Sequence, residues 1–164
     1  LVGSQLNRAI DAQGSRVDAR GQVRDWWSQA DRDAWASLGN RVAAQYASQD
    51  YPGVKGARVD GALVRNVALA DQAGLELAAA AHAKAQPQAS QAARQALFEA
   101  WSRLWAQQVA ANTASERLKT DIHAPGPLRS NLPAANLPEF AAAFACKPGE
   151  PMTRAETDQV HIWR

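Results

Sequence analysis

Apolar residues recur every three or four positions along most of this chain, and this spacing predicts a mainly helical protein. The clearest case is a helix expected from about Ser28 to Ser48, which opens with the capping pattern of Ser28 and Asp31. The apolar stripe of this helix consists of Trp35, Leu38, Val42 and Tyr46.

The same spacing predicts two longer helices, over residues 62–85 and 91–112. Pro87 ends the first of them, and Ser90 can cap the second. One broad apolar face of the second helix contains Leu97, Phe98, Trp101, Leu104, Trp105 and Val109. These two helices should therefore supply much of the core.

Shorter elements are expected at the ends of the chain. Residues 2–10 resemble the last turns of a helix that is too short to be stable alone, so we expect an upstream chain to complete it. Residues 120–127 are too rich in proline to be helical, and a last short helix is expected over 136–144. The alternation of apolar and polar residues over 160–163 predicts a short terminal strand.

Composition narrows the class of protein. A chain of 164 residues is long enough for a single domain with its own core. The net charge of +2, without a block of clustered basic residues and aromatics, gives no support for a nucleic-acid partner. Cys146 is the only cysteine, which excludes an internal disulfide and a cysteine-based metal site. No apolar run is long enough to predict a membrane span.

Five short motifs occur in order along nearly the whole chain. They are the stretch from Val2 to Gly14, Asp25-Trp26-Trp27, Asp60-Gly61 with Ala70-Asp71-Gln72-Ala73-Gly74-Leu75, Asp121-x-His123-Ala124-Pro125 with Arg129, and Cys146-Lys147-Pro148-Gly149 with Met152 and Val160-x-Ile162-Trp163. In order and frame they resemble the C-terminal part of the neprilysin family of zinc peptidases. The resemblance implies a zincin-like catalytic-domain fold over residues 1–164, as one segment that lacks its upstream part.

The positions that hold the chemistry of that family are replaced. The family motif Gly-His-Glu-x-x-His presents two imidazoles to Zn²⁺ from one helix, and its glutamate takes a proton from zinc-bound water. Here Ser4 and Arg8 stand at the histidine positions and Gln5 at the glutamate position. Val67 stands where a second helix supplies the third ligand. None of these side chains can do the same work, so the resemblance implies no bound zinc and no catalysis.

Two aspartates match residues that orient the zinc histidines in the family, namely Asp11 and Asp71. Two buried carboxylates without a cation would be costly. We therefore predict, as a hypothesis, that the Arg8 guanidinium lies between them as a structural plug. The alternative that Arg8 points to solvent stays open.

His123 and Arg129 match family residues that hold the oxyanion of the transition state and the substrate backbone. Their presence predicts a peptide groove that still binds. The alternative is that His123 is satisfied by Asp121 and that Arg129 pairs structurally with an acidic neighbour. The family's upstream substrate strand is absent from this chain, so any groove needs another segment to complete it.

The function expected from these observations is that of a catalytically inactive peptidase homologue with a structural or peptide-binding role. Its expected partner is the upstream half of the same domain or a peptidase-like chain. One alternative is a subunit of a heteromeric zinc endopeptidase whose active site comes from a partner, and another is an independent helical binding module. The family resemblance alone implies an extracytoplasmic, periplasmic location.

Overall fold

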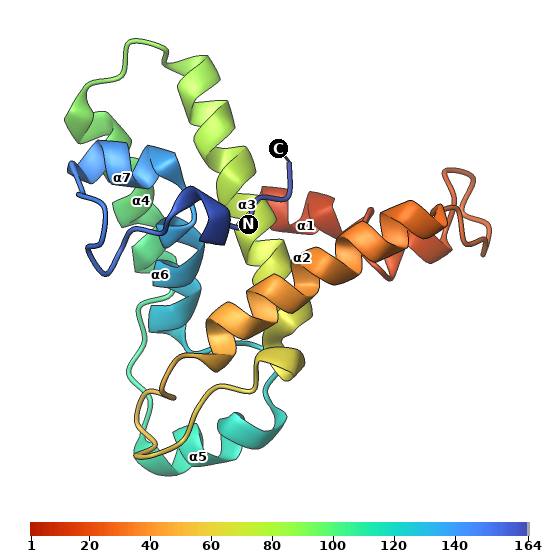
Figure 1. Cartoon of the computed structure of the whole chain (residues 1–164), viewed down its shortest axis with the longest axis horizontal. Helices are drawn as coiled ribbons and strands as arrows, with labels where there is room; N and C mark the ends of the chain where they lie inside the picture. Colours follow the sequence, from red (N-terminus) through yellow and green to blue (C-terminus); the bar gives the residue numbers. More distant parts are fainter. Residues whose placement is uncertain (164) are drawn as a thin grey trace.

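The computed structural model describes residues 1–163 and is mainly helical, as predicted (Figure 1). The helices are α1 (Val2–Arg8), α2 (Gln29–Ala47), α3 (Gly61–Ala85), α4 (Gln91–Leu104), α5 (Ala111–Thr120), α6 (Gly126–Ala135) and α7 (Pro138–Phe144). Two short 3₁₀ turns, Gly14–Arg16 and Glu156–Asp158, complete the regular structure. No helix in this described part of the chain is long and apolar enough to span a membrane.

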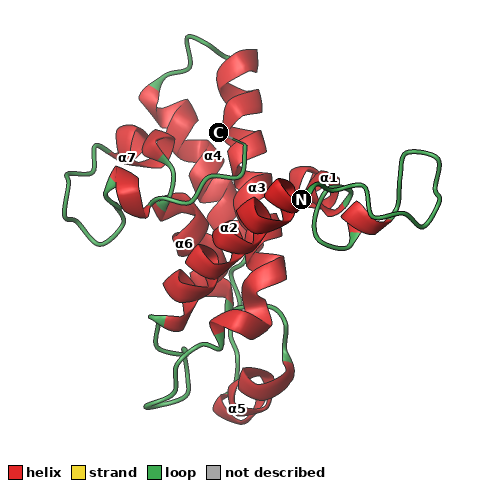
Figure 2. Cartoon of the chain, turned by 45° about the vertical axis from the view of Figure 1, so that its right-hand side comes forward, coloured by secondary structure: helices red, strands yellow, loops and turns green. Residues whose placement is uncertain are grey.

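The longest helix, α3, is the element against which α1, α2, α4 and α6 pack (Figures 1 and 2). The Asp60 carboxylate caps its start by accepting the N–H groups of Ala62 and Leu63. Every residue from Val67 to Glu76 is buried. A helix that is buried all round in its middle must satisfy its polar side chains inside the protein.

Two apolar clusters flank α3. The first lies between α2 and α3 and includes Tyr46 and Leu69, with Val160 from near the C-terminus. The second joins α3 to α4 and α7 and includes Leu75, Phe98 and Trp101. Phe98 contributes an edge-to-face ring pair with Phe140 at 5.3 Å. The α2 stripe and four members of the second predicted stripe, Leu97, Phe98, Trp101 and Trp105, belong to these clusters or pack against them. Leu104 and Val109, which the sequence placed on the same face, are exposed.

Three sequence expectations are corrected by the structure. The helix expected to reach residue 112 ends at Leu104, and the chain runs without helix until α5 begins at Ala111. Residues 126–135 form α6, which the proline content concealed. A proline in the first turn of a helix costs little because the N–H groups there have no helical partner.

The expected terminal strand is the third correction, because residues 160–163 pair with a side chain instead of another strand. The N–H groups of Ile162 and Trp163 donate to the Glu76 carboxylate at 3.0–3.1 Å. The Trp163 indole N–H also donates to the Ala73 carbonyl at 3.1 Å. The alternating pattern therefore reflects an extended segment laid along α3.

A buried chain of polar side chains continues inward from Glu76. The Gln72 amide donates to Glu76 at 2.9 Å, and the Asn136 amide donates to Gln72 at 2.9 Å. Asn136 and Gln45 then exchange two hydrogen bonds of 2.9 Å. This chain joins α3, α6 and α2 with the C-terminal segment, which we define as residues 158–163.

Helix α1 crosses α3 at two glycines. A Cβ atom at Gly3 would lie 3.0 Å from the Gly74 Cα, and one at Gly74 would collide with Ser4, including its backbone nitrogen at 2.8 Å. Since α1 has only seven residues, this close approach is its main anchorage.

We expect Gly74→Ala to lower the free energy of unfolding by about 1–3 kcal/mol through overpacking, reduced by the roughly 1 kcal/mol gain in helix propensity. Urea unfolding measures the change in the free energy of unfolding, and hydrogen exchange of the α1 amides measures how firmly α1 stays attached to α3. The control Ala80→Gly, at an exposed position of α3, should cost only about 1 kcal/mol and leave α1 exchange unchanged. Stabilisation by Gly74→Ala would contradict the close crossing.

Candidate functional site

Helices α1 and α3 position the four residues that the motif frame predicts to stand at the family's zinc-site positions. Ser4 is buried against α3, whereas Gln5 and Arg8 are exposed, because one face of α1 meets α3 and the other faces outward. Val67 is buried on α3. The structure brings Arg8 and Val67 together with Asp11 in the lining of one cavity of about 110 Å³, and Ser4 and Gln5 lie outside that lining.

The donor atoms at these positions do not fit zinc. They are a buried hydroxyl, an exposed amide, a guanidinium without a lone pair and a hydrocarbon. Within residues 1–163, no group of three or more histidine, cysteine, aspartate or glutamate side chains is arranged to hold a metal. No catalytic step through a metal can be derived from these side chains.

The Asp11 carboxylate is engaged locally. It accepts the N–H groups of Gln13 at 2.8 Å and Gly14 at 2.9 Å and so closes the turn that follows α1. This is an Asx-type turn, which aspartate forms readily. The carboxylate thus has hydrogen-bond donors without any need for a metal or an arginine.

Asp71 is 2% exposed and is held by Arg129 from α6. The Arg129 Nε and Nη2 atoms donate to the two Asp71 oxygens at 2.7 and 2.9 Å. The guanidinium also stacks 3.7 Å from the centre of the Trp105 ring. Burial raises the pKa of the Asp71 carboxyl above its usual value, and the hydrogen bonds and charge of Arg129 oppose that rise.

The predicted Arg8 plug is wrong. Arg129 occupies both oxygens of Asp71, and the N–H groups of Gln13 and Gly14 bind Asp11. In the part of the chain that the structure describes, the Arg8 side chain makes no ion pair or hydrogen bond, and it is exposed. The solvent-facing alternative describes Arg8 correctly.

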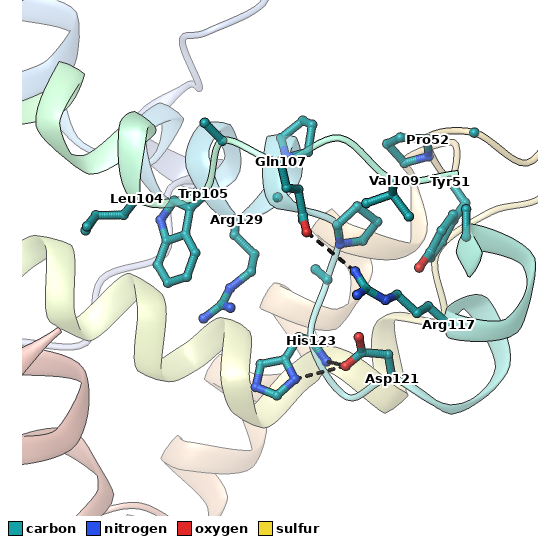
Figure 3. A pocket seen from close by; sticks show the side chains of 17 residues that line it. Tyr51, Pro52, Leu104, Trp105, Gln107, Val109, Arg117, Asp121, His123 and Arg129 are labelled. Atoms are coloured by element: carbon teal, nitrogen blue, oxygen red, sulfur yellow. Dashed lines mark hydrogen bonds and ion pairs between the residues drawn. The ribbon is translucent and has the colours of Figure 1, made fainter. Parts of the chain in front are cut away.

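His123 and Arg129 line one cavity of about 410 Å³ (Figure 3). The His123 backbone N–H and Nδ1 both lie 2.9 Å from the same oxygen of Asp121. Partial burial works against ionisation of Asp121, but these hydrogen bonds and the nearby charges of His123 and Arg117 lower the pKa of its carboxyl. The His123–Asp121 contact and the Arg129–Asp71 ion pair are the two contacts expected if these residues have structural roles. Peptide binding by His123 and Arg129 stays a prediction.

Sequence reasoning missed two members of this cavity. Trp105 packs against the second apolar cluster, as its place on the predicted stripe indicates, but it lies just past the end of α4 and its ring also faces Arg129 (Figure 3). Arg117, on α5, reaches across the cavity to the Gln107 side chain at 3.4 Å. Neither role had a signal in the sequence, because each depends on the chain ending α4 at Leu104.

Comparisons with known proteins agree with the motif order. Residues 2–160 match the family model described as Peptidase family M13. The neutral endopeptidase of Lactococcus lactis is 28% identical over 163 residues, which are 99% of this chain and 25% of that protein. Neprilysin-1 of Caenorhabditis elegans is 28% identical over 174 residues, covering 99% of this chain and 23% of that protein. The chain spans about a quarter of the length of these curated relatives.

Solved structures show the same fold. The crystal structure of PepO from Lactobacillus rhamnosis matches with a TM-score of 0.87 and 33% identity, covering 99% of this chain and 25% of that chain. The zinc metalloprotease Zmp1 of Mycobacterium tuberculosis, in complex with an inhibitor, matches with a TM-score of 0.88 and 25% identity over 99% of this chain and 26% of that one. The helices described above are therefore arranged as in these two proteins.

Proposed function

Because its family model covers residues 2–160, the chain belongs to peptidase family M13, and we propose that it is a catalytically inactive segment of that fold with a structural or peptide-binding role. The predicted family and helical fold are confirmed by the comparisons. The inactivity is our inference from the side chains at the positions of the metal ligands.

The observation that carries the proposal is the simultaneous replacement on two helices. Ser4, Gln5 and Arg8 on α1 and Val67 on α3 offer no zinc donor set and no general base. Replacement of a single ligand could leave a weakened site, whereas replacement of all of them leaves nothing to activate water.

A second feature supports a fold that is stable without metal. The buried Asp71 carboxylate is paired with Arg129 in a two-point hydrogen bond. Its charge is therefore balanced by a side chain of this chain. A buried carboxylate that depended on a bound cation would instead destabilise the metal-free protein.

The cavity lined by His123 and Arg129 supports the peptide-binding part of the proposal. Its volume of about 410 Å³ lies in the range of small-ligand sites. Apolar walls from Leu104 and Val109 stand beside the charged side chains of Arg117 and Arg129. Such a mixture suits an extended peptide that offers both carbonyl groups and apolar side chains.

The rest of the domain and its location belong to the same proposal. Since the chain spans about a quarter of its relatives, we propose that an upstream half or a peptidase-like partner completes the domain. We also propose an extracytoplasmic, periplasmic location, by analogy with the family.

Zinc content and peptide hydrolysis of the purified chain test this proposal. We expect negligible zinc after equilibrium dialysis, and about one equivalent in the fourfold variant Ser4→His, Gln5→Glu, Arg8→His, Val67→Glu, which supplies two imidazoles and a carboxylate. Thermal melts of both proteins control for folding. About one equivalent of zinc in the unaltered chain, with hydrolysis of a peptide, would refute the proposal; zinc found only with a co-purifying chain would favour a shared enzyme.

A further inference from the structure

Helix α5 forms one wall of the proposed peptide cavity, the one of about 410 Å³. It contributes Ala114 and Arg117 to the lining of this cavity. The stretches on either side of the helix, residues 106–110 and 121–125, have no helical structure. A helix between two irregular segments can leave the core on its own if few contacts hold it there.

Few contacts hold α5. Of its ten residues, all of them described by the structure, Ala114 is the buried one, and Leu118 also packs against the first apolar cluster. The side-chain hydrogen bonds of Ser115 and Thr120 stay within the helix. The residue before the helix, Ala110, has no side-chain oxygen to accept the N–H groups of the first turn. An isolated helix of fewer than about 12 residues is marginal in water, so α5 depends on its two apolar contacts.

One hydrogen bond crosses the cavity from α5. The Arg117 Nη1 atom donates to the Gln107 side-chain oxygen at 3.4 Å, which is long for a hydrogen bond. In the view of Figure 3, this bridge separates Trp105 and Arg129 on one side from Tyr51 on the other. An extended peptide that fills the cavity must therefore break the bridge.

The two ends of α5 are held differently. At its C-terminal end the Asp121 carboxylate accepts the His123 N–H at 2.9 Å, and the Asp121 N–H donates to the Arg117 carbonyl at 2.9 Å. At the other end, no N–H group of residues 107–110 donates to an acceptor within residues 1–163. The helix can therefore leave the core at its N-terminal end and remain attached at the Asp121–His123 turn.

We propose that α5 is a lid on the peptide cavity, which opens about the Asp121–His123 turn and is latched by the hydrogen bond between Arg117 and Gln107. Opening joins the two sides of the cavity and releases the Arg117 guanidinium to donate to a peptide carbonyl. The nature of the ligand rests on the proposed peptide-binding function, whereas the motion rests on the contacts of α5 alone.

Labelling of a thiol introduced at Ala114 measures the opening. In a Cys146→Ser background, Ala114→Cys places one thiol on the buried side of α5, and Ala68→Cys places one in the same apolar cluster on α3, where the native side chains are 2% and 3% exposed. If α5 opens alone, dithiobis(nitrobenzoate) should react at position 114 at least about tenfold faster than at position 68, at a rate that low urea concentrations leave unchanged.

The latch is tested in the same assay. Arg117→Ala, added to Ala114→Cys, should raise the labelling rate about fivefold, because the hydrogen bond across the cavity is lost. The matched addition Lys119→Ala removes a positive charge from the same helix, outside the cavity lining, and should change the rate less than about twofold. Equal labelling rates at positions 114 and 68 would overturn the lid, and equal effects of Arg117→Ala and Lys119→Ala would overturn the latch.

A disulfide between Gly53→Cys and Ala114→Cys tests whether opening admits a peptide. A Cβ atom at Gly53 would lie 3.4 Å from the Ala114 Cβ, close to the separation of about 3.5–4.5 Å that a disulfide requires. Gly53 has a φ of 83°, which strains other residues, so the reduced form of the same variant is the reference. In the Cys146→Ser background, the oxidised form should bind the capped peptide Ala-Leu-Ala-Leu-Ala at least about tenfold more slowly than the reduced form.

Equal association rates in the oxidised and reduced forms would overturn the lid as the route into the cavity. If the peptide binds to neither form, the peptide-binding part of the proposed function is refuted, and the labelling rates still decide whether α5 opens. Thermal melts of each variant control for folding.

Discussion

Replacing Arg129 by alanine is expected to lower the free energy of unfolding by about 3–5 kcal/mol, because it leaves the Asp71 carboxylate buried without its partner. The same change removes the guanidinium that stacks on Trp105. Urea unfolding monitored by circular dichroism at neutral pH gives the size of the loss.

The pH dependence of this loss has a defined sign. Burial already raises the pKa of Asp71 in the folded protein, and removal of Arg129 raises it further. A carboxyl group with a raised folded pKa contributes most stability below its unfolded pKa and loses that contribution as the pH rises through the folded value. The difference between the variant and the unaltered chain should therefore shrink as the pH falls toward 3.8, the ordinary pKa of aspartate.

The matched controls are Asp71→Asn and the double variant Arg129→Ala, Asp71→Asn. If the cost of Arg129→Ala arises from an unpaired buried charge, the double variant should be more stable than Arg129→Ala alone. A loss that is the same at every pH and is not relieved by Asp71→Asn would show that packing on Trp105 is the main role of Arg129.

Replacing Glu76 by alanine should cost about 3 kcal/mol and release the C-terminal segment. Its carboxylate accepts the N–H groups of Ile162 and Trp163 and the Gln72 amide. Each buried donor left without an acceptor costs about 1–3 kcal/mol, and detachment of the segment into water limits the total. Hydrogen exchange at residues 160–163 reports the release.

Glu76→Gln is the conservative control, because its amide oxygen can still accept one or two of these hydrogen bonds. It should lose clearly less stability than Glu76→Ala. Glu116→Ala, at an exposed position of α5, should stay within about 0.5 kcal/mol of the unaltered chain. Unchanged exchange at residues 160–163 in Glu76→Ala would contradict the anchoring role of Glu76.

The sequence predicted helices whose limits are set locally. Ser28 and Asp31 form the predicted capping box at the start of α2, and Pro87 follows the end of α3. Helix α6 was missed because proline usually ends a helix, whereas Pro127 lies in the first turn, where its lack of an N–H does no harm. Local rules thus succeed for Pro87, which lies after the end of a helix, and fail for Pro127, because a proline is compatible both with the end of a helix and with its first turn.

The contacts of the candidate site were harder to predict. Arg129 and Asp71 are 58 residues apart, so their pairing depends on how α6 packs on α3. Arg8 lies one helical turn before Asp11 in the sequence, and this spacing favoured it as the partner of the aspartates. In the structure, however, the Arg8 side chain is exposed. The assignment of Ser4, Gln5, Arg8 and Val67 to the zinc-site positions depends only on residue identity within the motif frame, and it stays a prediction.

The polar chain that runs from Gln45 through Asn136 and Gln72 to Glu76 also constrains the order of assembly. Its links join residues 64, 86 and 91 positions apart. Contacts of such long sequence separation form late, since loop closure must come first. Until residues 162–163 are in place, the Glu76 carboxylate lacks its backbone donors, so burial of the middle of α3 depends on the C-terminal segment.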